Sequence, residues 1–178
     1  MGIEKSEYQQ RREQLMAKVG NGTAIFHSAP MAVMHNDVEY VYRQDSDFYY
    51  LTGFNEAEAV AVFAPHHEEH RFILFVQPKD PKKETWTGYR CGVEQAKEKY
   101  GADEAYPIAE LAEKLPQYVA KANRIYYRLG RDQEMNNQIL ALWQNSWQAI
   151  RKMVLAPPRS QILDSSLLRC ASSKVLLK

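Results

Sequence analysis

The sequence contains little cysteine. Its two cysteines, Cys91 and Cys170, lie far apart in the chain and form no C-x-x-C pair. A disulfide framework or a zinc knuckle needs several cysteines at short, regular spacings, so neither is expected. The chain also lacks a glycine-rich phosphate loop and the G-x-S-x-G turn that carries a nucleophilic serine. These absences exclude several common classes of enzyme and predict two free thiols.

An excess of charge of one sign and a long apolar run are also missing. Lysine and arginine number 23 against 22 aspartates and glutamates, which leaves a net charge of +1. Proteins that bind nucleic acid or anionic lipid usually carry a basic excess, so we expect no nucleic acid and no membrane partner. No stretch approaches the roughly 18 apolar residues of a membrane-spanning helix, and the segment Met1 to Arg12 is too polar for a signal peptide. We therefore expect a cytoplasmic protein.

Apolar residues make up 45% of the 178 residues, which is enough to bury the core of one globular domain. Segments with strand-like and helical patterns alternate along the chain. The predicted strands are Thr23 to His27, Ala57 to Pro65, Arg71 to Val76 and Arg124 to Leu129, and helices are predicted at Val93 to Tyr100 and Ile108 to Ala122. Because a short polar loop joins the two central strands as in a hairpin, the sheet should be mixed. The sequence thus predicts an α/β fold, with a mixed β-sheet flanked by helices.

Local signals predict where several helices begin and end. Ser6 and Gln9 have the spacing of a capping box, and Gly20 should stop the helix that follows. Pro116 should interrupt the helix predicted from Ile108, because proline lacks the backbone N–H. The last helix carries an apolar stripe that should close at a pair of prolines. The stripe and its end consist of Ile139, Leu142, Trp143, Ile150, Met153, Val154, Ala156, Pro157 and Pro158.

The run His66 to His70, HHEEH, matches in form the H-x-x-E-H pattern of some zinc enzymes. That chemistry needs its histidines on one face of a helix, whereas this run follows Ala64-Pro65 and precedes a predicted strand. We interpret the run as a solvated hairpin loop. A hydrolase that uses these histidines remains an alternative, for which metal-dependent cleavage by the pure chain would be required.

The segment Asp37 to Glu58 places many aromatic residues among charged ones without the period of a helix or a strand. Asp45 or Asp47 can cap a short helical turn there, and Gly53 can supply the positive φ that ends it. The side chains expected to point into the core are Phe48, Tyr49 and Leu51. Packing and capping explain this segment without a ligand.

Two runs in the chain resemble a known family. Tyr42 to Glu56, YRQDSDFYYLTGFNE, resembles the signature of the N-terminal domain of aminopeptidase P proteins, in the creatinase and prolidase superfamily. Glu84 to Gly92, ETWTGYRCG, resembles the Trp-Gly loop of the same family. The resemblance extends from about Tyr8 to Asp164, so residues 1–164 are expected to form the aminopeptidase P N-terminal domain and residues 165–178 a divergent tail.

The resemblance implies that catalysis lies elsewhere. In this family a C-terminal pita-bread domain holds two divalent metal ions, manganese in the full-length enzymes, through carboxylates and a histidine. That domain releases the N-terminal residue that precedes proline. No position in this sequence matches those ligands, so we assign no catalytic residue, no metal ligand and no cofactor to the chain. The chain alone is expected to be inactive, and Xaa-Pro peptides are expected to bind only the full-length enzyme.

The resemblance also implies a role in assembly. N-terminal domains of the family mediate self-association, and we expect a dimer or a tetramer. In bacterial members the Trp-Gly loop borders the active site of a neighbouring subunit, and Trp86 matches the tryptophan of that loop. Asp37 is a second candidate for the same border, placed by its distance before the signature. A packed or partly exposed loop residue is the alternative interpretation of Trp86.

The tail departs from the family, which continues here into a helix similar to EMRLVKSPAE. Back-translation of Arg169 to Lys178 with suitable codons, followed by regrouping from the last base of the Arg169 codon, gives MRLVKSPAE. We hypothesise a frameshift near Leu168, which would leave Cys170 without a selected role. The nucleotide sequence across that codon is the decisive observation.

Two alternative functions stay open from the sequence. One is the N-terminal domain of a prolidase, because prolidases share the Trp-Gly loop, although the Tyr42 to Phe54 run favours aminopeptidase P. The other is a peptide- or protein-binding module that has lost catalysis and binds through the aromatic segment. Titration of the purified chain with peptides separates this module from the first interpretation.

Overall fold

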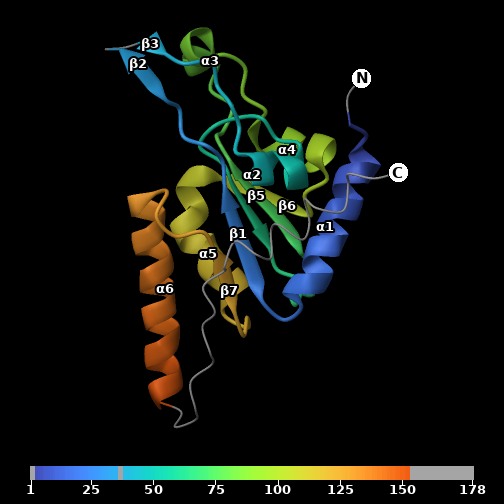
Figure 1. Ribbon diagram of the computed structural model, residues 1–178, viewed down its shortest axis with the longest axis vertical. Helices are drawn as coiled ribbons and strands as arrows, with labels where there is room; N and C mark the ends of the chain where they lie inside the picture. Colours follow the sequence, from blue (N-terminus) through green and yellow to red (C-terminus); the bar gives the residue numbers. More distant parts are fainter. Residues whose placement is uncertain (1–2, 36–37, 153–178) are drawn as a thin grey trace.

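The computed structural model describes residues 3–35 and 38–152, and its centre is a five-stranded sheet (Figure 1). The strands lie in the order β6, β5, β4, β1, β7. Their bounds are Thr23–His27 for β1, Val60–Phe63 for β4, Phe72–Val76 for β5, Glu104–Pro107 for β6 and Ile125–Tyr127 for β7. Strands β1, β4 and β5 pair antiparallel, whereas β7 pairs parallel with β1 and β6 pairs parallel with β5. The predicted mixed sheet is confirmed.

Helices cover both faces of this sheet. The helices of the described residues are α1 (Lys5–Val19), α2 (Ser46–Thr52), α3 (Pro81–Thr87), α4 (Gly92–Tyr100), α5 (Leu111–Val119), which follows a 3-10 turn at Ile108–Glu110, and α6 (Gln133–Lys152). Apolar residues of α1, α2 and α4 pack on one face, and those of α5 and α6 pack on the other. Figure 1 shows α1 and α6 on opposite sides of the strands. The domain therefore has three layers, as predicted for a sheet flanked by helices.

The central hairpin divides its side chains between the two faces. Phe63, Phe72 and Leu74 belong to the cluster under α1, α2 and α4, whereas Val62 and Ile73 belong to the cluster under α5 and α6. All of these residues are buried. Because successive residues of a strand point to opposite faces, a strand covered on both faces reads as a continuous apolar run. This is why the hairpin could be predicted from the sequence.

The beginning of α1 differs from the predicted capping box. Glu4 precedes the helix without a side-chain cap, and Ser6 lies inside the first turn, where its hydroxyl donates to Glu4 Oε2 at 3.4 Å. The capping-box prediction was wrong because the helix begins before Ser6, whose backbone is already helical. The end of the helix was predicted correctly. Gly20 has a φ of +59°, and its N–H donates to Met16 O at 3.0 Å.

The sequence did not predict strand β6, the β2–β3 hairpin or helix α3. Strand β6 buries only Ala105 on the edge of the sheet, and β2 (Val33–His35) and β3 (Val38–Glu39) form a separate hairpin. The third element is α3, in the run that was expected to be a loop. Edge strands and short hairpins with one polar side carry little periodicity, so nothing in the local pattern separated them from loops.

Two helices differ in detail from the predictions. Pro116 does not interrupt α5, which continues to Val119, because the buried Leu115 and Tyr118 hold the helix against the sheet. In α6 the predicted stripe is present at Ile139, which is buried. The prolines predicted to close this helix, the domain limit at 164 and the tail 165–178 lie outside the described residues.

No helix in the described part is long and apolar enough to cross a membrane.

Candidate functional site

The candidate site begins with the signature run, residues 42–56, whose helix α2 is capped by Asp45. Oδ1 of Asp45 accepts hydrogen bonds from the backbone N–H groups of Asp47 at 3.0 Å and Phe48 at 3.1 Å. This arrangement satisfies two N–H groups that have no partner within the helix. Gly53 ends the helix with a φ of +68°, and its N–H donates to Tyr49 O at 2.8 Å. Of the two predicted caps, Asp45 is the one used.

The aromatic residues of α2 divide between the core and the surface. Phe48 and Leu51 are buried, with exposed fractions of 0% and 4%, as predicted. Tyr49 is 40% exposed, so the prediction that it points into the core was wrong. One residue advances a helix by about 100°, which turns Tyr49 away from the face of Phe48. Its ring lies edge-on to Tyr8 of α1, with 6.2 Å between the ring centroids.

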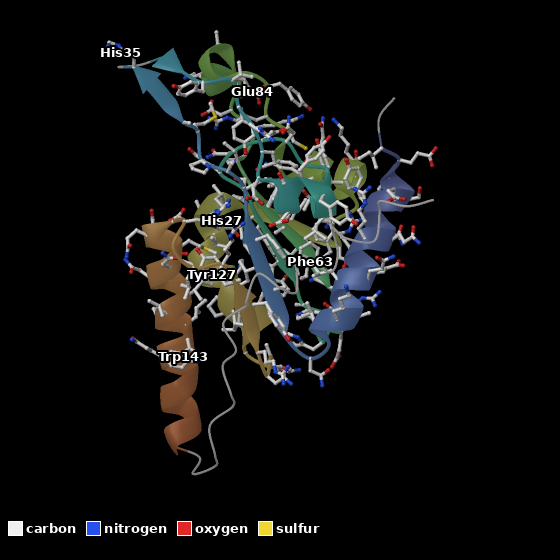
Figure 2. All side chains as sticks on the ribbon, viewed as in Figure 1. His27, His35, Phe63, Glu84, Tyr127 and Trp143 are labelled. Carbon is white, nitrogen blue, oxygen red and sulfur yellow. The ribbon has the colours of Figure 1, made fainter. Side chains whose placement is uncertain are left out.

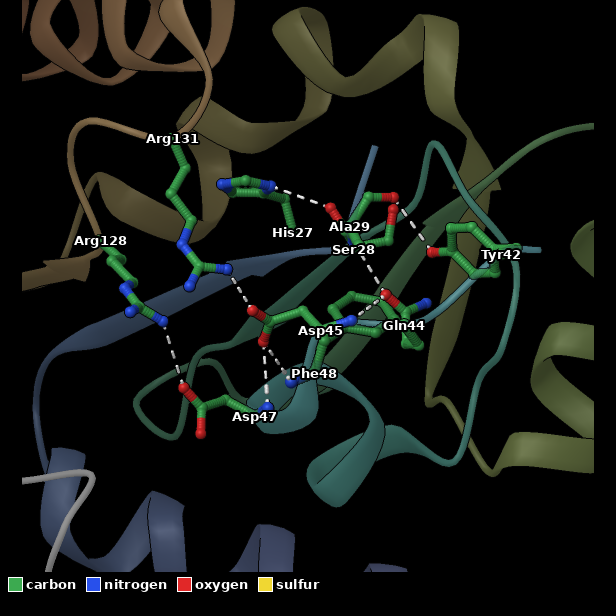
Figure 3. A network of polar contacts seen from close by, with 10 residues as sticks. All are labelled: His27, Ser28, Ala29, Tyr42, Gln44, Asp45, Asp47, Phe48, Arg128 and Arg131. Carbon is green, nitrogen blue, oxygen red and sulfur yellow. Dashed lines mark hydrogen bonds and ion pairs between the residues drawn. The ribbon is translucent and has the colours of Figure 1, made fainter. Parts of the chain in front are cut away.

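Gln44 is the centre of a hydrogen-bond network beside α2 (Figure 3). Its side-chain Oε1 accepts from the N–H groups of Ala29 at 2.8 Å and Asp45 at 2.9 Å. Its Nε2 donates to the carbonyls of Phe54 at 3.2 Å and Glu56 at 3.0 Å. The residue is only 8% exposed, and these four bonds use both lone pairs and both protons of the amide. The amide therefore fixes backbone and has no further bond to offer a ligand.

Tyr42 strengthens the same connection. Its hydroxyl lies 3.1 Å from Ala29 O and 3.2 Å from Glu56 O, so the single proton is shared between two carbonyls. Burial raises the pKa of Tyr42 to about 12. The phenol consequently stays protonated and can donate at any physiological pH. Tyr42 and Gln44 together hold the segment that follows β1 against the end of the signature run.

Ion pairs connect the signature to the segment that precedes α6 (Figure 3). Asp45 pairs through Oδ2 with Arg131, and Asp47 Oδ2 lies 3.6 Å from a guanidinium nitrogen of Arg128. Burial, followed by the charge of Asp45, raises the pKa of Asp47, which the two arginines oppose. Both arginine side chains are about half exposed, so each pair contributes little to stability.

Glu56 ties the signature to the segment after α3. Its carboxylate accepts from the N–H of Cys91 at 2.9 Å and 3.2 Å, and burial raises the pKa of Glu56. Cys91 is buried and free, and burial together with the charge of Glu56 raises the pKa of its thiol to about 11. A thiol with such a pKa is almost entirely protonated at pH 7, so Cys91 is a poor nucleophile.

The model of the family described as "Aminopeptidase P, N-terminal domain" matches residues 8–126, which include the whole signature run, residues 42–56. The chain belongs to this family. The aminopeptidase P resemblance predicted from the signature and the Trp-Gly run is thereby confirmed.

Curated relatives of the family agree with this assignment. The chain is 38% identical over 130 residues to the Xaa-Pro aminopeptidase of Escherichia coli and 36% identical over 126 residues to that of Haemophilus influenzae. These alignments cover 72% and 70% of this chain. They cover only 30% and 29% of the two relatives, so the chain matches less than a third of each enzyme.

Solved aminopeptidase P structures share the fold. The Pseudomonas aeruginosa aminopeptidase PepP is 40% identical, with a TM-score of 0.82, and the match covers 93% of this chain and 38% of that protein. A zinc-substituted Escherichia coli aminopeptidase P in complex with product is 32% identical, with a TM-score of 0.79. Here too the match covers 91% of this chain but only 37% of the enzyme. The aminopeptidase P N-terminal domain is thus the part of these enzymes to which the chain corresponds.

Of the two predicted border residues, the structure describes the backbone position of Trp86 only. Trp86 lies in α3, and Asp37, between β2 and β3, lies outside the described residues, as does the side chain of Trp86. Figure 1 shows the hairpin and α3 at the same end of the long axis, and Figure 2 shows His35 and Glu84 there, far from the core residue Phe63. Gly88, with a φ of +81°, follows α3. The Trp-Gly run is therefore a short helix with a glycine end, and the border role stays a prediction.

The described residues do not fit the metal centre of the family. In residues 3–35 and 38–152, no group of three or more His, Cys, Asp or Glu side chains is placed to hold a metal ion. The run His66 to His70 lies in the turn between β4 and β5, as predicted, and not on a helix. No catalytic step is therefore assigned to a metal held by this part of the chain.

The sequence did not identify Gln44, Tyr42 and Glu56 as the residues that organise the site. Apart from the N–H of the adjacent Asp45, their partners are backbone groups 10 to 35 residues away, and the ion-pair partner of Asp45 is 86 residues away. The only local signal is a glutamine in an aromatic-rich run. A buried glutamine needs partners for its amide, and this requirement could have marked Gln44.

Proposed function

We propose that this chain supplies the non-catalytic N-terminal part of a Xaa-Pro aminopeptidase, with a role in assembly and in bordering an active site held by a neighbouring subunit. The observation that carries the proposal is the family match at residues 8–126, together with a chain that spans less than a third of its curated relatives. The signature network supports it, because its polar groups bond to the chain itself. Such a network builds a scaffold and offers no catalytic group.

Hydrolysis of Xaa-Pro peptides with two manganese ions is proposed only for an enzyme that also contains the family's catalytic domain. The test is an assay of the pure chain with an Xaa-Pro peptide and added manganese. We expect no turnover. Metal-dependent cleavage that co-purifies with the folded chain and is lost in the variant His67→Asn would instead support the alternative hydrolase at the histidine turn.

Self-association is the proposed role of the projecting end, which is the end of the molecule that carries the β2–β3 hairpin and α3. In the sequence, Tyr40 and Val41 follow β3 and Tyr89 comes shortly after α3, and their exposed fractions are 52%, 97% and 61%. A two-stranded hairpin is marginal in isolation, so β2 and β3 would gain from a partner surface. Apolar side chains that are exposed together commonly mark an interface.

Sedimentation equilibrium of the wild-type chain tests this role. We expect a dimer or a tetramer that the variants Trp86→Ala and Asp37→Ala weaken. The control Trp143→Ala changes an exposed tryptophan on α6, away from the projecting end, and should leave the association unchanged. A monomer at all concentrations, or equal weakening by the control, contradicts the proposed interface.

The family comparison favours aminopeptidase P over the prolidase alternative. A peptide-binding module remains the second candidate, because Tyr49 of the signature is exposed. Calorimetric titration with proline-containing peptides tests it, and we expect no saturable binding to the chain alone.

The cytoplasmic location also stays a proposal, which fractionation of the source cells would test.

A further inference from the structure

The turn between β4 and β5 concentrates three histidines at the end of the sheet opposite to the signature. His66, His67 and His70 lie within this turn, and His66 Nδ1 is 3.2 Å from the carbonyl of Gly22, just before β1. The hairpin is closed at its base by a bond from Ala64 N to Arg71 O of 2.8 Å. The histidine turn, residues 64–71, is therefore attached to the domain by imidazole contacts that the aminopeptidase role does not use.

The protonation state of His67 is fixed by its hydrogen bond. The backbone N–H of His70 donates to Nδ1 of His67 at 3.1 Å. A backbone N–H can only donate, so Nδ1 must carry a lone pair and the ring proton must be on Nε2. A second proton on the ring would occupy Nδ1 and remove the acceptor of this bond.

The ring of His67 also attaches the turn to α5. It lies 5.0 Å from the ring of Tyr118 and 5.7 Å from the ring of His70, measured between centroids, with the two imidazoles nearly parallel. Tyr118 is fully buried in the cluster under α5 and α6. His67 is thus the contact between the turn and this face of the core.

The charges around His67 oppose its protonation. Burial, and then the neighbouring His70 and His66, lower the pKa of His67, and Lys121 after α5 acts in the same direction. Glu69 of the turn is the charged neighbour that acts in the opposite direction. An imidazolium at this position would face two further imidazoles and an ammonium group.

His70 faces a different charge on β6. Its Nε2 lies 3.9 Å from Glu104 Oε2, and the other oxygen of Glu104 accepts from Lys97 of α4 at 2.8 Å. The carboxylate is therefore already engaged by a lysine. It lies against His70, whose ring is stacked with that of His67.

We propose that the histidine turn is an acid-sensitive contact, in which a proton from solvent on Nδ1 of His67 breaks the bond from His70 N–H and releases the turn from α5. The direction of the pH effect follows from the proton affinity of His67 in the attached and in the released turn. The released turn binds the proton more readily than the attached turn, so acid favours release. The contact is complete above the ordinary imidazole pKa of about 6.5 and weakens as the pH falls below it.

Amide hydrogen exchange on the full chain, at pH 7.5 and pH 5.0, tests the proposal. After correction for the intrinsic rate at each pH, protection of the His70 amide should fall roughly tenfold at pH 5.0, the size expected for one lost hydrogen bond. The amide of Phe48 is the internal control, because it also donates to a side chain three residues earlier. Its protection should not change.

The variant His67→Asn separates protonation from other causes. Asparagine places an acceptor oxygen on the same Cγ as the histidine Nδ1 but does not titrate in this range. We expect a protected His70 amide at both pH values in this variant. Equal protection in the wild type at both pH values, or an unchanged fall in His67→Asn, overturns the proposal.

A second measurement does not depend on any variant. The nitrogen chemical shifts of the His67 ring at pH 7.5 report which nitrogen carries the proton. The proposal requires the proton on Nε2, and a protonated Nδ1 at pH 7.5 would refute it.

Discussion

The two ends of the central sheet use polar side chains in different ways. Beyond the carboxyl end of β1, a neutral amide and a neutral phenol, those of Gln44 and Tyr42, bond to backbone carbonyls and N–H groups. Before the amino end of β1, the histidine turn and Glu104 rely on groups that can titrate. The bonds of Gln44 and Tyr42 should therefore hold over a wide range of pH, whereas the contacts of the histidine turn should not.

The difference also shows what each sequence motif represents. Several residues of the signature have a specific structural task, such as capping α2 through Asp45 or filling the core through Phe48. The HHEEH run matches a zinc motif in letters, but a turn does not place its histidines as a helix would. A motif carries chemistry only in the element that gives its side chains the required geometry.

The largest expected effect is at Gln44. The variant Gln44→Met keeps the length of the side chain but removes the amide, which leaves buried N–H and C=O groups without partners. We expect the free energy of unfolding to fall by about 3 kcal/mol. Urea denaturation at pH 7.5 measures this loss.

The matched control is Gln9→Met on the exposed side of α1, where the amide bonds only to Glu13. It should change the free energy of unfolding by less than about 0.5 kcal/mol. Equal effects of the two variants would mean that the signature network does not stabilise the domain, and the contrast between the two ends would fail.

A smaller effect is expected at Asp45, which both caps α2 and pairs with Arg131. Asp45→Ala removes both interactions and should cost about 1 kcal/mol, most of it from the cap. Asp45→Asn retains a capping oxygen and loses only the charge, so it should cost a few tenths of that, about 0.3 kcal/mol. Urea denaturation of both variants, with and without added salt, measures the two contributions. If Asp45→Asn lowers the free energy of unfolding by much more than about 0.3 kcal/mol, the ion pair with Arg131 dominates over the cap.

The elements predicted from the sequence are those with a strong local pattern. Strands β4 and β5 are continuous apolar runs, and α4 ends at Gly101, whose φ of +70° suits glycine. Strand β6 was missed because its burial depends on being paired with β5, which is a property of the tertiary structure. Local sequence patterns cannot report pairing between segments about 30 residues apart.

The candidate site was predictable only in part for the same reason. The cap on α2 and the glycine at its end are local, and both were predicted. The bonds of Gln44 and the pair between Asp45 and Arg131 join segments that are distant in the chain. Family resemblance located the segment, but only the fold could show which atoms its polar side chains contact.

The smallest expected effect is at Glu104, on the pH-sensitive end. Burial alone would raise the pKa of Glu104, but the hydrogen bonds from Lys97 and the Ala105 amide, with the charge of His70, outweigh burial and lower it. A carboxyl whose pKa is lowered by folding stabilises the domain above its ordinary pKa, and this contribution is lost as the pH falls through the lowered value. Glu104→Gln should therefore cost about 0.5 kcal/mol at pH 7, as expected for a pair near the surface. The difference from wild type should shrink as the pH falls below the ordinary glutamate pKa of 4.5, and it should vanish only below the lowered value.

The control for this variant is Glu113→Gln, because Glu113 also pairs with a lysine, Lys114, but its side chain is 74% exposed. Its effect should be close to zero at every pH. Urea denaturation of the three proteins between pH 3.5 and pH 7.5 gives the comparison. If Glu104→Gln lowers the free energy of unfolding equally at pH 3.5 and pH 7.5, then the hydrogen-bond geometry of this side chain matters and its charge does not. The acid sensitivity of this end would then rest on His67 alone.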